Sequence, residues 1–221
     1  MSLDPTKTKK PQRKLPDEGL QPARCFAIID IGSHYKTFKG VKSETATQQV
    51  MLCFEFTKFM HKFGEDKPAE PLCIFNEYTF SAGVKAKLPK ILKAWGKLKS
   101  AVEQINLKPY LGQYCHINVE HTEGKDGNTY ANIGSSGLSI NSFMKETGAV
   151  PKKFHKDVWF DLDNFSWNLF LSLPKRAQKR IRECEEWNKI ISKHPEPIQQ
   201  NESAVEQIEA YQAVDDDSPA F

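Results

Sequence analysis

The order of its apolar segments is the feature that most constrains the fold of this chain. Apolar residues at every second position are typical of a strand with one buried face. Five segments of this kind follow one another, at residues 22–31, 47–56, 72–80, 113–121 and 129–134. Between the third and the fourth, apolar residues recur at the spacing of one helix face, at Val84, Leu88, Ile91, Leu92 and Trp95. The chain therefore predicts three strands, a helix and two further strands.

The connections between these segments indicate how the strands pair. The stretch 33–43 mixes aromatic residues with lysines and is predicted to be a loop, and 57–71 is predicted to be a polar connection. The Asp126-Gly127 step favours a tight hairpin between the last two strands. Three strands, a helix and a hairpin have the order of an OB-fold, a five-stranded Greek-key barrel. We therefore predict a mainly β fold, α+β overall, with an OB-fold domain over residues 15–142.

Alternation also assigns side chains to the two faces of each strand. In the first strand we place four residues on one face, namely Cys25, Ala27, Ile29 and Ile31. In the second strand the set expected to point inward is Val50, Leu52, Phe54 and Phe56.

Residues 143–194 are predicted to extend the barrel with a helical module. This segment is too rich in large apolar side chains for a linker: Phe154, Val158, Trp159, Phe160, Leu162, Phe165, Trp167, Phe170 and Leu173. Pro174 favours a helix start, so we predict one helix over residues 175–191. We expect the module to pack on the barrel. A surface that binds another protein is the alternative.

The two ends of the chain carry opposite charge. Residues 1–14 hold five basic side chains against Asp4 and are predicted to be a disordered arm, which either samples phosphate backbone or solubilises the terminus. Residues 195–221 are predicted to be a disordered acidic tail, with six acidic residues and no Lys or Arg after position 197. The chain has 31 basic and 28 acidic residues, so the rest carries 31 against 22, a net charge of +9. A basic body favours polyanionic ligands.

Several classes of protein are disfavoured by the sequence. No apolar run approaches the roughly 18 residues of a membrane span, and the N-terminus lacks a signal peptide, so a cytoplasmic protein is expected. The five cysteines are scattered without the paired spacing of a zinc site, so we expect no metal and no cofactor. Phosphate-binding loops and hydrolase motifs are missing, so an enzyme is not expected.

Lysines interleaved with aromatic residues predict a site for single-stranded nucleic acid, because lysines contact phosphates and aromatic rings stack on bases. In an OB-fold the loops after strands one and four flank the groove, and strands two and three form its floor. The predicted DNA-binding residues are Arg24, His34, Tyr35, Lys36, Phe38, Lys39, Lys42, Phe75, Tyr78, Lys125 and Tyr130. For Phe38 and Phe75, packing inside the protein is the competing interpretation.

The C-terminus, Val214-Asp-Asp-Asp-Ser-Pro-Ala-Phe221, resembles the acidic tip of bacterial single-stranded-DNA-binding proteins. The body resembles a bacteriophage single-stranded-DNA-binding protein family in Ala23-Arg-Cys, Ile29-Asp-Ile-Gly32, Asn76-Glu-Tyr-Thr79, Asn118-Val and Thr129-Tyr-Ala-Asn132. Further matches are Leu15-Pro, Leu111-Gly112, His121 and, in the module, Phe160-Asp-Leu-Asp-Asn, Trp167, Phe170 and Leu173-Pro174. The resemblance implies an OB-fold that coats single-stranded DNA during phage replication, recombination or repair. It does not identify contact residues.

The acidic tip is expected to bind protein partners. Carboxylates supply attraction to a basic pocket and a terminal ring supplies an apolar anchor. The predicted interaction residues are Asp215, Asp216, Asp217, Pro219 and Phe221, and the expected partners are replication or recombination proteins. Two alternatives remain: a strand-annealing recombination mediator, and an adaptor that binds proteins but no DNA.

Overall fold

The computed structural model describes residues 14–38, 40–83, 86–96, 105–124, 127–134, 140–142 and 152–197. Its strands are β1 (Gly19–His34), β2 (Thr37–Phe38), β3 (Val41–Lys42), β4 (Thr47–Lys62), β5 (Ala69–Thr79), β6 (Tyr114–Glu123), β7 (Thr129–Ile133), β8 (Ile140–Ser142) and β9 (Val158–Phe160). Its helices are α1 (Lys87–Ala94), α2 (Trp167–Leu171), α3 (Lys175–Arg182) and α4 (Trp187–Lys193), with 3₁₀ turns η1 (Lys108–Tyr110) and η3 (Leu162–Asn164).

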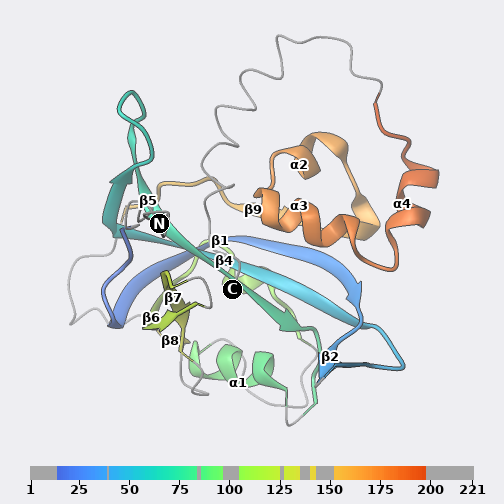
Figure 1. Cartoon of the computed structure of the whole chain (residues 1–221), viewed down its shortest axis with the longest axis horizontal. Helices are drawn as coiled ribbons and strands as arrows, with labels where there is room; N and C mark the ends of the chain where they lie inside the picture. Colours follow the sequence, from blue (N-terminus) through green and yellow to red (C-terminus); the bar gives the residue numbers. More distant parts are fainter. Residues whose placement is uncertain are drawn as a thin grey trace, which may run out of the picture.

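The fold is mainly β, and its centre is a curled antiparallel half-barrel in the strand order β5-β4-β1-β6-β7 (Figure 1). β1 pairs with β4 from Arg24↔Glu55 to His34↔Thr47. The start of β1 pairs with β6. β8 joins β6, β9 joins β1 in parallel, and β2 and β3 form a separate ribbon. Residues of β7 also approach residues of β5, so the two ends of the sheet curl toward each other.

The sheet is buried on both faces. One cluster fills the inside of the curl and includes the predicted inward set of β4, Val50, Leu52, Phe54 and Phe56, beneath α1. The opposite face carries a second cluster, in which the sheet residues Met51 and Cys53 pack against Phe160, Phe170 and other residues of the module. Figure 1 shows this layering, with α1 on one side of the sheet and α2, α3 and α4 on the other.

The predicted face assignment of the first strand was wrong after Cys25. Cys25 belongs to the cluster inside the curl, whereas Ala27, Ile29 and Ile31 belong to the cluster under the module. The register against β4 shifts between Cys25 and Ala27, which places a β-bulge at Phe26. The extra residue moves the side chains that follow it to the other face, up to a second register shift between Asp30 and Gly32. Alternation read across the bulge therefore misplaced three residues.

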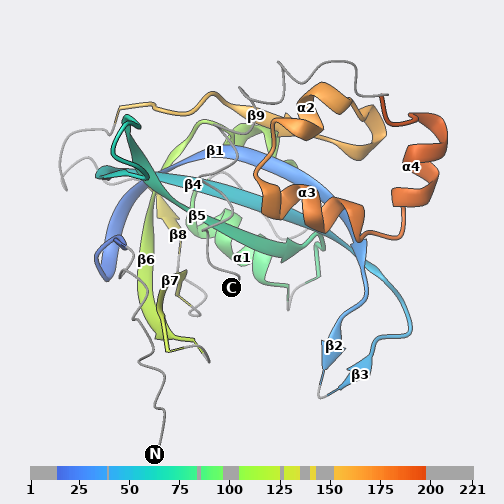
Figure 2. The same cartoon turned by 45° about the horizontal axis from the view of Figure 1, so that its top comes forward.

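The single helix predicted over residues 175–191 is two helices, because tertiary contacts interrupt it. The backbone N–H of Glu185 donates to the carbonyl of Ser33, and the N–H of Ser33 donates to a carboxylate oxygen of Glu186, at 3.1 and 2.9 Å. Cys184 packs on Gly32 beside these bonds. The turn between α3 and α4 thus clamps the module onto the end of β1 (Figure 2).

Other connections also differ from the sequence prediction. Much of the polar connection expected at 57–71 is paired strand, since β4 and β5 continue past a bulge to the pair Lys62↔Ala69. Part of the loop expected at 33–43 is the β2–β3 ribbon. β8 and β9 were not predicted, because strands of three residues are too short to display an alternation.

Among the described residues, none of the helices is long and apolar enough to cross a membrane.

Replacement of Gly32 tests the clamp between the module and β1. Gly32 and Gly19 both have positive φ angles, +78° and +89°, so alanine at either position adds about 1 kcal/mol of backbone strain. A Cβ at Gly32 would lie 2.6 Å from the Cβ of Cys184, whereas at Gly19 it would meet nothing within 4 Å. Gly32→Ala should therefore lower the free energy of unfolding by a further ~1–3 kcal/mol relative to Gly19→Ala, measured by urea denaturation. Equal losses would show that Cys184 does not press on Gly32.

Candidate nucleic-acid interface

The β2–β3 ribbon presents the aromatic and basic residues that the sequence predicted at 33–43. Two hydrogen bonds between Lys36 and Ser43 close the base of the ribbon. The N–H of Ser43 donates to the carbonyl of Lys36 at 2.7 Å, and the N–H of Lys36 donates to the side-chain hydroxyl of Ser43 at 2.9 Å. Gly40 takes the positive φ of +82° that its turn requires. Figure 2 shows the ribbon extending away from the sheet, and Val41 and Lys42 of β3 are exposed.

Tyr35 and two lysines are brought together at the base of this ribbon. The Lys42 ammonium lies 3.7 Å from the centre of the half-buried Tyr35 ring, a cation–π contact. Lys36 Nζ donates to the hydroxyl of Thr79 at the end of β5, at 2.6 Å. Phe80 follows Thr79 and is 37% exposed. One exposed region therefore combines an oriented ring with two positive charges.

Helix α3 extends the positive charge along β5. Its sequence, Lys-Arg-Ala-Gln-Lys-Arg-Ile-Arg, buries Ala177 and Ile181, and Lys179 is exposed on the other side. Arg176 and Arg180 both pair with Glu77 of β5, at 3.3 and 3.0 Å. Side chains two residues apart on a strand point to the same face, as those of Glu77 and Thr79 do. Helix α3, bound to Glu77, and the ribbon, bound to Thr79 through Lys36, are therefore attached to the same face of β5. We call Tyr35, Lys36, Lys42, Arg176, Lys179 and Arg180 the basic rim.

Sequence reasoning missed the contribution of α3 to the basic rim. The signal was present, because residues 175–182 include five basic residues among eight. The apolar spacing of this segment was used to predict a helix, and its basic residues were not assigned a role in binding. Only the fold shows that α3 lies beside β5.

The two predicted floor residues are core residues. Phe75 is 6% exposed and meets the ring of Phe26 edge-on at a centroid distance of 6.5 Å, under the module. Tyr78 is 3% exposed in the other cluster, inside the curl, where burial raises the pKa of its phenol. Residues three apart on a strand point to opposite faces, so the two rings do not share a surface. The packing interpretation of Phe75 is correct.

Arg24 is also a structural residue, which corrects its prediction as a DNA contact. It is 1% exposed, and its guanidinium forms ion pairs with Glu55 of β4 and with Asp157. The Glu55 carboxylate further accepts hydrogen bonds from His155 Nδ1 and the N–H groups of Phe154 and His155. A guanidinium buried between two carboxylates is not available to a phosphate.

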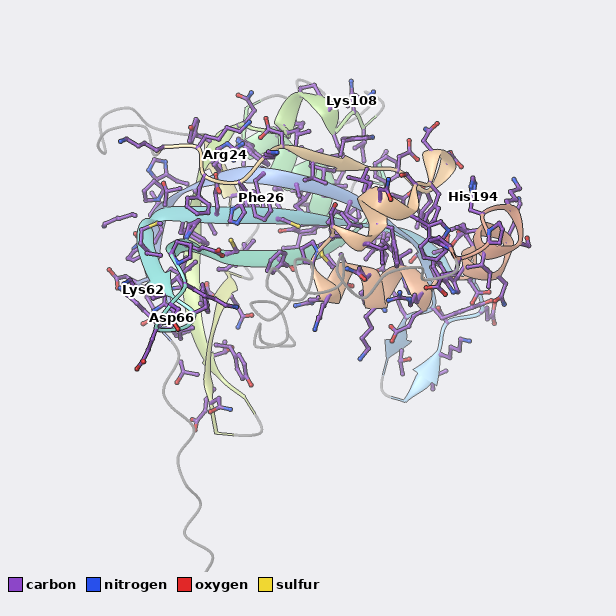
Figure 3. The ribbon with its side chains drawn as sticks, turned by 90° about the horizontal axis from the view of Figure 1, so that it is seen from above. Arg24, Phe26, Lys62, Asp66, Lys108 and His194 are labelled. Carbon is purple, nitrogen blue, oxygen red and sulfur yellow. The ribbon has the colours of Figure 1, made fainter. Side chains whose placement is uncertain are left out.

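The remaining predicted site residues are not brought together by the structure. His34 is 5% exposed, with Nε2 2.8 Å from the carbonyl oxygen of Ile31, so it positions the ribbon and does not face solvent. Tyr130 is half-buried in β7, opposite Thr122 of β6. Figures 2 and 3 show that the β6–β7 hairpin and the β2–β3 ribbon lie apart. Lys39, Lys125, the Phe38 side chain and the whole acidic tip lie outside the described residues.

The described part of the chain contains no group of three or more His, Cys, Asp or Glu side chains suited to a metal ion. At the basic rim, positive charge lies beside an oriented ring.

Comparison with known proteins finds no matching family model, no matching curated protein and no matching solved structure.

The network around Glu55 predicts a stability that depends on pH. Burial by itself raises the pKa of Glu55, but the hydrogen bonds from His155, from Phe154 N–H and from Arg24 outweigh it, so the pKa lies below its usual value. A lowered pKa in the folded state stabilises the protein above the unfolded pKa of about 4.3, and this contribution is lost as the pH falls through the folded value. Glu55→Gln should therefore lower the free energy of unfolding by about 3 kcal/mol at pH 7.

The difference between wild type and Glu55→Gln should begin to shrink below about pH 4.3, where the carboxylate of the unfolded wild-type chain takes up a proton, and it should be lost as the pH falls through the lowered folded-state pKa of Glu55. Urea denaturation at several pH values measures this difference in the free energy of unfolding. Glu65→Gln is the control variant, because Glu65 lies in an exposed turn. A difference that is constant from pH 7 to pH 3 would contradict this assignment.

Proposed function

We propose that this protein binds single-stranded DNA without sequence preference, through the basic rim, and coats it during phage DNA replication, recombination or repair. Lysine side chains of the rim contact successive phosphates, and Tyr35 stacks on a base. Such contacts do not read sequence, because each nucleotide has a phosphate and each base has a π face.

The observation that carries the proposal is the arrangement of Tyr35, Lys36 and Lys42. Lys42 covers the Tyr35 ring and Lys36 ties the ribbon to Thr79, so the aromatic residue is oriented before any ligand binds. An oriented ring loses little conformational entropy on binding. The basic helix α3, fixed to β5 through Glu77, supplies further charge on the same side.

The half-barrel supports an OB-fold as the finer architecture. Its strand order β5-β4-β1-β6-β7 corresponds to 3-2-1-4-5 of the five predicted strands, in the Greek-key sense, with β2 and β3 lying in the connection between strands one and two. In this interpretation the module covers the outer face of strands one to three. The ligand is thereby directed to the rim beside that face.

Three large aromatic residues of the module do not favour the adaptor alternative. Phe160, Phe165 and Phe170 are buried in the cluster beneath the helices, together with Met51 and Cys53 of the sheet. Rings that fill the module's own core are not displayed to a partner. In our proposal, protein partners bind the acidic tip, residues 214–221.

Variants of the ribbon test the proposal by fluorescence anisotropy with labelled oligo-dT. Tyr35→Ala should weaken binding by about 1–3 kcal/mol, the cost of one lost stack, and Tyr35→Phe should retain most of the affinity. Lys36→Ala combined with Lys42→Ala should reduce the slope of log K against log salt by about 1.4, since each lost phosphate contact contributes about 0.7.

Lys58→Ala combined with Lys62→Ala is the matched control, because both lysines are exposed and lie in β4 near its far end, where Figure 3 labels Lys62. The control should leave both the affinity and the salt slope nearly unchanged. Binding that is insensitive to salt, or that prefers duplex DNA, would refute the proposed function. Faster pairing of complementary strands on addition of the protein would instead support the annealing alternative.

Deletion of residues 214–221 tests the role of the tip. The shortened chain should bind oligo-dT as well as or better than the full chain, because the deletion removes three carboxylates that compete with phosphates. It should also lose binding to a replication protein in a pull-down with purified components. Loss of DNA binding on deletion would mean that the tip has another role.

A further inference from the structure

A second cluster of lysines around an exposed aromatic ring lies at residues 152–157, which we call the strap. Its sequence is Lys-Lys-Phe-His-Lys-Asp, and Lys152, Lys153 and Lys156 are exposed. Phe154 is 45% exposed, among the most exposed large apolar side chains described. The strap is not part of the basic rim.

The strap is held in place by a buried carboxylate. Glu55 accepts from the N–H of Phe154 at 3.2 Å and from the N–H of His155 at 2.9 Å, and its side chain is 0% exposed. The Arg24 guanidinium fixes Glu55 from the other side and also bonds to the carbonyl of His155, at 3.3 Å. The backbone on both sides of Phe154 is thus anchored to the sheet while its ring remains in solvent.

The Phe154 ring is supported by a neighbouring ring. The ring of His155 stacks on Phe26 at a centroid distance of 4.6 Å, and Phe154 meets His155 at 5.0 Å with an interplanar angle of 67°. A continuous series of rings therefore leads from the core to the surface and ends at Phe154. This support orients the exposed ring without covering it.

We propose that the strap is a second contact site for single-stranded nucleic acid, in which Phe154 stacks on a base and Lys152 and Lys156 contact the flanking phosphates. Lys153 pairs with Asp157 at 2.9 Å, so Lys152 and Lys156 provide the charge on either side of the ring. This inference rests on the proposed function and extends its footprint along the sheet.

A nucleic acid fits the strap better than an acidic peptide does. A peptide with a terminal aromatic anchor requires a recess that receives its ring. Phe154 instead protrudes, as a base-stacking platform does. An acidic peptide is therefore the competing ligand, and the experiment below includes it.

The strap and the basic rim lie at different ends of β1. The strap is bonded to Arg24, and the ribbon follows His34, ten residues further along the strand, which corresponds to about 33 Å. Figure 3 shows Arg24 and Phe26 on the side of the sheet away from the β2–β3 ribbon. An oligonucleotide of about 16 nucleotides, the upper end of the site sizes of OB-folds, is long enough to contact both.

The test compares Phe154→Ala with Phe63→Ala in the full chain, using labelled oligo-dT of about 16 nucleotides. Phe63 is a matched control, since it is 38% exposed and meets His61 edge-on at 4.9 Å, much as Phe154 meets His155. In sequence it is flanked by Lys62 and Lys67 as well as by Glu65 and Asp66, so basic and acidic neighbours balance, whereas three lysines and one aspartate surround Phe154 in the strap. Phe154→Ala should weaken binding about fivefold or more, and Phe63→Ala less than about twofold.

Cross-linking to the same oligonucleotide carrying 5-iodouracil gives a second measurement. Peptides that contain Phe154 and peptides that contain Tyr35 should both carry adducts. Phe154 is 45% exposed and the strap is anchored through backbone groups, so Phe154→Ala should keep a denaturation midpoint close to that of wild type.

Four results would overturn the inference. If Phe154→Ala binds like wild type and the wild-type peptide that contains Phe154 carries no adduct, while Tyr35→Ala weakens binding, the strap is not a contact and the proposed function stands. If wild type binds no single strand, the proposed function fails and the strap fails with it. Equal losses in Phe154→Ala and Phe63→Ala would indicate a nonspecific effect. Unchanged DNA binding with lost binding of a synthetic 214–221 peptide would make the strap a peptide site.

Discussion

The burial of β1 and β4 on both faces is the constraint on which the rest of the structure depends. One face closes over α1, and the other is closed by residues 158–190 of the module. The bulge at Phe26 moves Ala27, Ile29 and Ile31 to the module side, where Phe160 and Phe170 cover them. Burial of apolar area at about 25 cal/mol per Å² makes this docking a dominant source of stability. The clamp between Ser33 and Glu186 fixes the end of the same interface.

In our proposal, this closure determines where the nucleic acid binds. A sheet face lined by Phe75 is a stacking floor only when it is open, and here the module occupies it. Exposed aromatic and basic side chains therefore lie around the covered face: at the ribbon, along α3 and at the strap. Each is fixed by a specific bond to the sheet, namely Lys36 to Thr79, Arg180 to Glu77 and the strap backbone to Glu55. The module thus completes the core on one face of the sheet and also carries the basic residues of α3 on its surface.

The elements with a clear periodic pattern were predictable from sequence, and those set by tertiary contact were not. The inward residues of β4 and the buried side of α1 follow from alternation and helical spacing. The bulge at Phe26, the break between α3 and α4 and the strand β9 depend on partners far along the chain, which no local pattern records. At the candidate site, Tyr35, Lys36 and Lys42 could be grouped from the sequence because they are close together along the chain. Arg24 was misassigned because its partners, Glu55 and Asp157, are 31 and 133 residues away.

The central claim is that single-stranded DNA binds around the module and does not displace it. Hydrogen–deuterium exchange of the full chain, with and without oligo-dT, tests this claim most directly, because it reports separately on the ribbon and on the module. We expect slower exchange at residues 35–43 and in the strap when DNA is bound, with exchange in β9, α2 and α3 unchanged or slower. Faster exchange across 158–190 on binding would mean that the module leaves the sheet to open the face beneath it, and would contradict the account.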